Sequence, residues 1–382
     1  TAAETAILDW LAAQRPAMLA LLEELVNTDS GSYDKAGVDR VGAQIRQFLE
    51  RHRIAHDTIV NDTFGDGIRA TVGAGANTSI LLMGHRDTVF PRQESARRPF
   101  RIDDGRAYGP GVADMKAGLV MNAFVLAAFA KFGAPTPLVG LFTADEEIGS
   151  PSSRALIESE ARRARAVFNS EPGRPGGNVV TGRKGGVFMR FQVAGKAAHS
   201  GANFSDGISA IEELARKTIA LHALTDLAKG ITVNVGLISG GQTVNTVAPW
   251  AKGEIDLRYV TLADREATMG RIGEIIATSF VPGTSTIVEI TGEFLPLVES
   301  TEGRRLFDLY SACARELGLK VAGEFTGGCA DSGFAAHAGA PTLCATGPIG
   351  ARAHTPDEYL EIDSIVPRAQ TLALAVMRVG GG

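Results

Sequence analysis

An apolar run that stops at three adjacent acids, within residues 138–153, constrains the fold of this chain more than any other feature. The run from Leu138 to Thr143 is apolar on both faces, which is typical of a central strand in a sheet covered by helices. It ends at Asp145, Glu146 and Glu147. Adjacent carboxylates at the end of a buried strand repel one another, so a metal ion is expected to hold them. For this segment alone, a solvated acidic loop is the alternative.

Length and composition limit the classes of protein that this chain can belong to. With 382 residues it is too long for one ordinary core, so we expect two domains, one inserted in the other. Its 45% hydrophobic and 21% charged residues describe an ordinary soluble globular protein. A net charge of −5 without a basic block argues against a nucleic-acid partner. No uninterrupted apolar run reaches the roughly 18 residues that cross a bilayer, so no membrane partner is expected.

The cysteines and the first residue bear on the compartment. The three cysteines, Cys313, Cys329 and Cys344, are odd in number and lack CxxC spacing, which indicates neither a disulfide framework nor a thiolate zinc site. We interpret Cys329 as a packed small residue rather than a reactive thiol. We expect a cytoplasmic location. A periplasmic one stays open, because the chain begins at Thr1 without Met and a leader could have been removed.

Apolar periodicity predicts alternating helices and strands in the first half of the chain. Pro16 interrupts the first helical stretch, and Ser152 or Ser153 is placed to cap the helix after the acidic segment. The expected helices are 7–26, 38–52, 119–132 and 153–165, and the expected strands are 68–72, 79–83, 138–143 and 166–168.

Potential metal ligands follow several of these strands. His85 ends one strand, and Asp87 points the same way two residues later, where it can orient the imidazole. Asp114 lies in a glycine-rich turn before a long apolar helix, and Glu171 follows the strand 166–168. Ligands collect at the carboxyl ends of strands in open α/β sheets, so this repeated placement, with Glu147, predicts one site. Taken singly, His85 could be a loop histidine whose hydrogen bonds are made within the protein, and Asp114 could be a helix N-cap.

Several segments together resemble the co-catalytic zinc peptidases of the M20 family, most closely its glutamate-carboxypeptidase-like branch. The match covers nearly the whole chain. The segments are GHRDTVFP, YGPGVADMKAG, TADEEIGS, SEP, GKAAHSG, EIDLRY, TGGCAD and ARAHTPDEY. The fold that this resemblance implies is α/β, a catalytic domain with a central mixed sheet covered by helices plus an inserted lid or dimerisation domain.

The resemblance implies two zinc ions, replaceable by cobalt or manganese, with Asp114 as the bridging ligand. One ion would also be held by His85 and Glu171, and the other by Glu147 and His354. His354 carries little signal by itself, because it lies in a loop far along the chain from the other ligands. Imidazole nitrogens and carboxylate oxygens suit zinc, and two ions about 3.5–4 Å apart can share a water and lower its pKa.

By the same resemblance, Glu146 is the general base and Asp87 the acid that orients His85. Glu146 would take a proton from the shared water and later give it to the leaving amine. Relatives usually carry a third Gly, Thr or Ser where Cys329 and Ala330 stand, which leaves any substrate contact by that loop in doubt.

The segment from residue 183 to residue 295 is expected to form the inserted domain, between catalytic segments 1–182 and 296–382. Its expected elements, 185–194, 206–224, 231–238, 251–261, 262–279 and 285–291, give the order βαββαβ of a ferredoxin-like fold. An exposed edge strand would let two copies join their sheets, so we expect a homodimer.

Three residues of the inserted domain match functional positions of the family. His199 matches a residue that stabilises the oxyanion in the partner's active site of dimeric relatives. Asn245 and Arg258 match groups that hold the substrate carboxylate. A salt bridge with Glu254 or Asp256 is the alternative for Arg258.

The function that we expect is hydrolysis of the amide bond next to a free carboxylate, in a C-terminal glutamate or an N-acyl amino acid. Two alternatives stay open. The same metal site could hydrolyse another C–N bond, in an aromatic amine or a carbamoyl group, or the chain could be a non-catalytic metal-dependent binding protein. The presence of Glu146, an acid that is not expected to bind metal, favours an enzyme.

Overall fold

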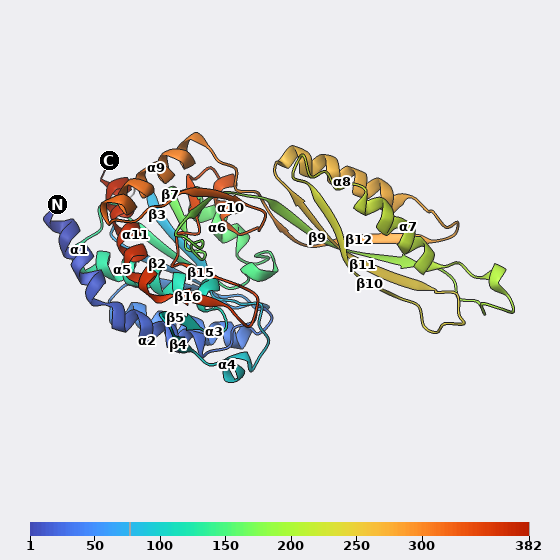
Figure 1. The fold of residues 1–382 in the computed structure, drawn as a ribbon, viewed down its shortest axis with the longest axis horizontal. Coiled ribbons are helices and arrows are strands. Elements are labelled where there is room, and N and C mark those ends of the chain that lie inside the picture. The colour runs from blue at the N-terminus through green and yellow to red at the C-terminus, as the bar shows by residue number, and fades with distance from the viewer. Residues whose placement is uncertain (76–77, 382) are drawn as a thin grey trace. The chain divides into compact units, whose positions relative to one another are not determined.

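The computed structural model describes residues 1–75 and 78–381, which form two compact units (Figure 1). The first unit consists of Thr1–Gly182, Glu299–Thr326 and Phe334–Gly382. The second consists of Arg183–Val298 and Gly327–Gly333. We describe each unit by itself.

An eight-stranded mixed sheet forms the centre of the first unit. Its inner strands β6, β3, β7 and β14 are mutually parallel, and β2 joins them antiparallel to β6. Every residue of β3 and β6 is buried, as the apolar runs predicted. The strands, in sheet order, are β1 (Ala55–Ile59), β2 (Gly67–Val72), β6 (Leu138–Thr143), β3 (Ser79–His85), β7 (Ala164–Asn169), β14 (Thr342–Cys344), β8 (Val179–Arg183) and β13 (Gly323–Thr326).

Helices pack on this sheet and bury one large core. The apolar helix α5 and the C-terminal helix α11 both contact β3. The segment Val112–Phe132, which includes α5, is long and apolar enough to cross a membrane, yet 94% of its most apolar window is buried inside the protein. The helices are α1 (Ala2–Ala13), α2 (Arg15–Val26), α3 (Lys35–Arg51), α4 (Glu94–Arg97), α5 (Ala117–Phe132), α6 (Arg154–Ala161), α9 (Thr301–Glu316), α10 (Ser332–His337) and α11 (Ile365–Gly380).

The N-termini of two helices, α2 and α6, differ in detail from the sequence-based expectations. The first helical stretch is divided into α1 and α2 at Gln14, with Pro16 in the first turn of α2, where its missing N–H costs nothing. Ser153 takes the N-cap position of α6, but its hydroxyl donates to Asp145 instead of capping the helix.

A small antiparallel sheet lies beside the turn that carries Asp114. Its strands β15 (Gly350–Ala351), β16 (Tyr359–Glu361), β5 (Arg106–Tyr108) and β4 (Arg101–Asp103) pair in that order. Because β16 pairs with β5, the loop between β15 and β16, which contains His354, is held near residues 108–114.

The second unit has the expected ferredoxin-like order βαββαβ. One antiparallel sheet, in the order β10-β11-β9-β12, is covered by two helices over a separate hydrophobic core. The outer strands β10 and β12 are sheet edges. The elements are β9 (Gly185–Ala194), α7 (Ala210–His222), β10 (Thr232–Gly240), β11 (Trp250–Tyr259), α8 (Leu262–Ala277) and β12 (Ser285–Phe294).

Candidate metal centre

The carboxyl ends of three parallel strands bring the predicted ligands together. His85 is the last residue of β3 and lies opposite Thr143, the last residue of β6. Glu146 and Glu147 occupy the short turn that follows β6, and Glu171 comes two residues after the end of β7. The parallel register therefore delivers a histidine and three acids to the same edge of the sheet.

Asp114 lies between two histidines. Its Oδ1 is 3.2 Å from His85 Nε2, and its Oδ2 is 3.4 Å from His354 Nε2. Each histidine also faces a carboxylate of its own, since His85 Nε2 is 3.4 Å from Glu171 Oε1 and His354 Nε2 is 3.1 Å from Glu147 Oε2. The structure thus places all five predicted ligands in one cluster with Asp114 at its centre.

Several ligand atoms in this cluster are buried without a hydrogen-bond partner among the described residues. They are His85 Nε2, Asp114 Oδ1, Glu147 Oε1 and Glu171 Oε1. Leaving a buried polar atom unsatisfied is unfavourable, so these atoms fit a ligand that accepts electron pairs. Groups of three, His85 with Asp114 and Glu147, and His85 with Glu146 and Glu171, lie close enough to hold a metal ion.

The electrostatics of the cluster favour a cation. Burial and the neighbouring Asp114 raise the pKa of Glu147 to about 7. Hydrogen bonds to Asp114 and Glu147 raise the pKa of His354 to about 10. The carboxylates therefore attract positive charge strongly, and a divalent ion can replace the proton on the imidazole ring.

Asp87 is a buried acid that connects His85 with the acidic turn. Its Oδ1 lies 3.3 Å from His85 Nδ1 and accepts a hydrogen bond from the N–H of Glu146, and its Oδ2 accepts from the N–H of Glu147. The hydroxyl of Ser32 donates to the same Oδ2 at 2.7 Å. Although burial opposes ionisation, the contact with His85 holds the pKa of Asp87 below its usual range. Asp87 is thus placed to orient both the imidazole and the turn.

Glu146 lies on the border of the cluster. Its side chain is 8% exposed, and its Oε2 is 3.8 Å from His85 Nε2. This position is close enough for Glu146 to contact either a metal ion or a water beside it.

Glu358 is a functional candidate that the sequence analysis missed. Its fully buried carboxylate accepts hydrogen bonds from the N–H groups of Gly111, Ala113 and Asp114, at 3.2, 2.9 and 2.9 Å. Burial raises the pKa of Glu358 to about 7. The available signal was an acid four residues after His354, together with a glycine-rich turn whose N–H groups needed acceptors.

The backbone conformation at Asp114 excludes the interpretation of this residue as a helix N-cap. The N-cap of α5 is Lys116, and Asp114 has non-helical backbone angles, with φ −107° and ψ 93°. The side chain of Lys116 is buried and donates to the carbonyl of Thr28 at 2.9 Å. Asp114 is therefore free to direct both carboxylate oxygens into the cluster.

In the second unit, His199 is exposed and its ring has a defined tautomer. The N–H groups of Gly201 and Ala202 both donate to His199 Nδ1, each at 3.1 Å. Because Nδ1 accepts, the proton of the neutral ring lies on Nε2, which can act as a donor. Asn245 lies next to it, with its carbonyl accepting from the N–H of Ser200.

Arg258 is paired within the second unit, as the salt-bridge alternative expected. Its Nε and one terminal nitrogen contact the two oxygens of Asp256 at 2.7 and 3.1 Å. The other terminal nitrogen contacts the sulfur of Cys329. Glu254 instead pairs with Arg190 at 3.3 Å. Burial raises the pKa of the Cys329 thiol, consistent with a packed residue rather than a reactive one.

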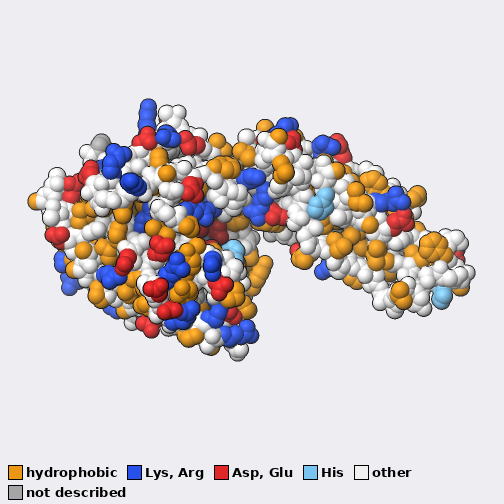
Figure 2. All heavy atoms as spheres, in the orientation of Figure 1, with side chains coloured by type: hydrophobic (Ala, Val, Ile, Leu, Met, Phe, Trp, Pro, Cys, Tyr) orange, Lys and Arg blue, Asp and Glu red, His pale blue; other side chains and the backbone are white. Residues whose placement is uncertain are grey.

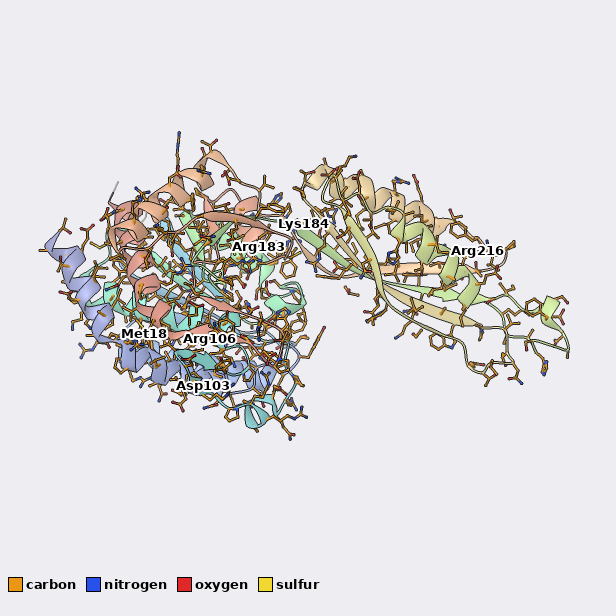
Figure 3. The ribbon with its side chains drawn as sticks, viewed as in Figure 1. Met18, Asp103, Arg106, Arg183, Lys184 and Arg216 are labelled. Carbon is orange, nitrogen blue, oxygen red and sulfur yellow. The ribbon has the colours of Figure 1, made fainter. Side chains whose placement is uncertain are left out.

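Arg183, which Figure 3 labels, is the first residue of the second unit and makes its side-chain contacts within that unit. It is buried and donates to the carbonyls of Gly328 and Cys329 at 3.3 and 3.1 Å. These contacts tie the segment 327–333 to the second unit.

Comparison with known proteins identifies relatives along the whole chain. Residues 81–378 match the Peptidase family M20/M25/M40. Carboxypeptidase G2 from Pseudomonas sp. (strain RS-16) is 29% identical over 376 residues, covering 97% of this chain and 91% of that protein. Acetylornithine deacetylase from Klebsiella pneumoniae (strain 342) is 28% identical over 330 residues, covering 80% and 82%.

A solved structure supports the fold. The M20 family metallo-carboxypeptidase Sso-CP2 from Sulfolobus solfataricus matches with a TM-score of 0.79 over 95% of this chain and 99% of that one, at 18% identity. This likeness confirms the predicted fold class.

Proposed function

Since the chain belongs to peptidase family M20/M25/M40 and is a metal-dependent hydrolase, we propose that it uses two zinc ions to cleave the amide bond next to a free carboxylate. The products would be an acid and a free amino acid, glutamate or another. Cobalt or manganese are expected to substitute for zinc, because the donors are imidazole and carboxylate groups.

The observation that carries this proposal is the symmetry around Asp114. Each of its oxygens faces one histidine, and each histidine faces a further carboxylate. This arrangement offers two sets of ligands, and Asp114 belongs to both. One set adds His85 and Glu171, and the other adds His354 and Glu147. Metal ions held by these residues would supply positive charge to polarise a substrate carbonyl and to lower the pKa of water.

Side chains of the protein would then transfer the proton and orient the groups around it. We assign the proton transfer to Glu146, whose carboxylate lies 3.8 Å from His85 Nε2: it would take a proton from water and deliver it to the leaving amine. Asp87 keeps His85 Nδ1 engaged, which leaves Nε2 directed at Asp114 and Glu171. His199, with its proton on Nε2, is suited to donate to a developing oxyanion.

The relatives support an amide as the scissile bond. One is named a carboxypeptidase and the other an acetylornithine deacetylase, and both names describe cleavage of an acyl–amine bond. We assign Arg258 and Asn245 to the substrate carboxylate. Arg258 already binds the carboxylate of Asp256, so it would have to share or exchange this partner when substrate enters. Hydrolysis of another C–N bond, in an aromatic amine or a carbamoyl group, is the second candidate, since it needs only the metal centre.

We also propose that two copies associate through residues 183–295. The strand β10 is an open sheet edge, and Leu237 and Ile238 on it are 64% and 63% exposed. Figure 2 shows hydrophobic side chains gathered on the visible face of the second unit. Analytical ultracentrifugation tests this association, and a monomer at micromolar concentration would contradict it.

A hydrolysis screen tests the function. Purified protein would be given N-acyl amino acids, C-terminal glutamyl peptides, aryl amides and carbamoyl amino acids, with and without a chelator. We expect metal-dependent release of an amino acid from the first two classes. Release from only the other classes would favour the second candidate, and no chelator-sensitive hydrolysis would reject both.

A further inference from the structure

A fully buried arginine, Arg86, stands in the sequence between the candidate ligand His85 and its partner Asp87. Its side chain is buried although a guanidinium is always charged in proteins. Burying a charge is unfavourable unless its donors find acceptors. The groups that Arg86 contacts therefore show what this charge does in the fold.

The guanidinium of Arg86 donates to main-chain carbonyls of three separate segments. Its Nε donates to the carbonyl of Thr143 at 3.2 Å, and its backbone N–H donates to the same carbonyl at 3.0 Å. One terminal nitrogen donates to the carbonyl of Val38 on α3 at 3.1 Å, and the other donates to that of Asp66. Since Thr143 is the last residue of β6, Arg86 joins the end of this strand to α3 and to the loop before β2.

The loop that ends at Asp66 is itself attached to α3. The N–H of Asp66 donates to the carboxylate of Asp39 at 2.8 Å, and Lys35 Nζ contacts both carboxylates, each at 2.8 Å. The two carbonyls that bind the terminal nitrogens of Arg86 are therefore held relative to each other by contacts within this part of the chain.

The turn that carries Glu146 and Glu147 is fixed from two sides. Arg86 holds the carbonyl of Thr143, three residues before Glu146. Asp87 accepts hydrogen bonds from the N–H groups of Glu146 and Glu147 at 3.0 and 3.1 Å. Arg86 thus sets where the turn begins, and Asp87 sets where its two acids lie.

Gly42 on α3 provides the space for this guanidinium. A Cβ added at Gly42 would lie 2.0 Å from the terminal nitrogen of Arg86 that binds Val38. Glycine in a helix interior is unfavourable relative to alanine. The approach of the guanidinium is a physical reason for glycine at this position.

We propose that Arg86 is a positioning residue of the metal centre, which acts through the carbonyl of Thr143 to hold the turn of Glu146 and Glu147 against His85. This inference rests on the proposed metal-dependent hydrolysis. A displaced turn would move both a metal ligand and the proton acceptor. Loss of the contacts of Arg86 should therefore weaken metal binding and slow turnover.

Two substitutions that retain the positive charge test this role in the full chain. Gly42→Ala raises helix propensity but displaces the guanidinium from Val38, and Arg86→Lys keeps the charge without the planar fork. Each should weaken zinc binding about tenfold in competition with a zinc-binding dye, and should lower kcat more than it raises KM. Gly270→Ala on α8 is the matched control, because a Cβ there meets nothing within 4 Å, and it should keep the wild-type zinc affinity.

A purely structural role is separated by a variant of the second unit. Lys217→Met removes another buried cation that donates to three main-chain carbonyls, so it should lower the urea midpoint and leave zinc affinity unchanged. Wild-type zinc affinity in Gly42→Ala or in Arg86→Lys, or an equal loss in Lys217→Met, would overturn the role of Arg86. If the wild type binds zinc but cleaves no substrate, the proposed function fails while the zinc affinities still decide this inference. A wild type that binds no zinc would reject both.

Discussion

The carboxylate of Glu358 accepts a hydrogen bond from the backbone N–H of Asp114 at 2.9 Å, across 244 positions of sequence. The same carboxylate also holds the N–H groups of Gly111 and Ala113. Because Asp114 stands between the two histidines, the turn that Glu358 secures sets the position of the central ligand.

We therefore expect Glu358→Ala to weaken zinc binding by about tenfold to a hundredfold, as loss of an outer-shell partner commonly does. Glu358→Gln should have a smaller effect. Its amide oxygen can still accept from Ala113 and Asp114, the pair that shares Oε1 in the wild type. Competition titration with a zinc-binding dye measures the affinities. Wild-type affinity in Glu358→Ala would show that the turn does not need this acceptor.

Glu146 is expected to matter for turnover rather than for metal content. Glu146→Gln removes the proton acceptor but keeps the size of the side chain, so kcat should fall by about 10²- to 10⁴-fold. Elemental analysis should find the same metal content in variant and wild type. A variant that lost its metal would instead identify Glu146 as a ligand, a role its 3.8 Å distance from His85 permits.

Metal binding should weaken as the pH falls below about 10, where His354 is protonated, and more steeply below about 7, where Glu147 is protonated too. Burial and Asp114 raise the pKa of Glu147 to about 7, and hydrogen bonds to Asp114 and Glu147 raise that of His354 to about 10. Both groups must lose their protons to bind a metal, so protons compete increasingly with zinc at lower pH. Zinc affinity measured from pH 8 to pH 5 tests this, and an affinity independent of pH would contradict it.

Local patterns predicted the strands and the residues that follow them, because apolar runs and acids at their ends are features of adjacent residues. The segment 138–143 is β6 as predicted, and His85 ends β3. His354 required the family resemblance, since it reaches Asp114 from a loop 240 positions away that the β16–β5 pairing holds in place.

Contacts made only by the folded chain could not be predicted in this way. Ser153 was expected to cap a helix, but buried Asp145 needs hydrogen-bond donors and takes its hydroxyl. Likewise, Glu358 and Ser32 gained their partners, Asp114 and Asp87, only through tertiary pairing. Such pairs join backbone turns to distant side chains, and neither member has a periodic pattern.

His199 should contribute to the reaction more than to substrate binding. A donor to a developing oxyanion acts mainly in the transition state, so His199→Ala should lower kcat by about 10²- to 10³-fold with a smaller change in KM. His222, which accepts from the N–H of Val235 in the same unit, offers a control substitution to alanine. An unchanged kcat in His199→Ala would remove the residue from the mechanism.

The second unit also contains a buried ion pair whose removal should destabilise it. Glu213 and Lys217 on α7 are fully buried, with Lys217 Nζ 2.9 Å from Glu213 Oε1. Lys217 also donates to the carbonyls of Ile275 and Ile276, and Glu213 accepts from the N–H of Val281. Glu213→Gln leaves a buried ammonium without its counter-charge, so the free energy of unfolding should fall by about 3–5 kcal/mol.

The neighbouring exposed pair on the same helix is the control for this prediction. Glu212 and Arg216 lie 2.7 Å apart with side chains 52% and 54% exposed, and Figure 3 labels Arg216 on α7. Glu212→Gln should therefore change the free energy of unfolding by less than about 1 kcal/mol.

Burial opposes ionisation of Glu213, but Lys217 and the backbone N–H groups lower its pKa below the usual 4.5. Its stabilising contribution is therefore complete above about pH 4.5 and lost as the pH falls through the lowered value. Urea titrations at pH 7 and pH 3.5 should show the Glu213→Gln deficit shrinking at the lower pH, and a deficit that grew there would contradict the assignment.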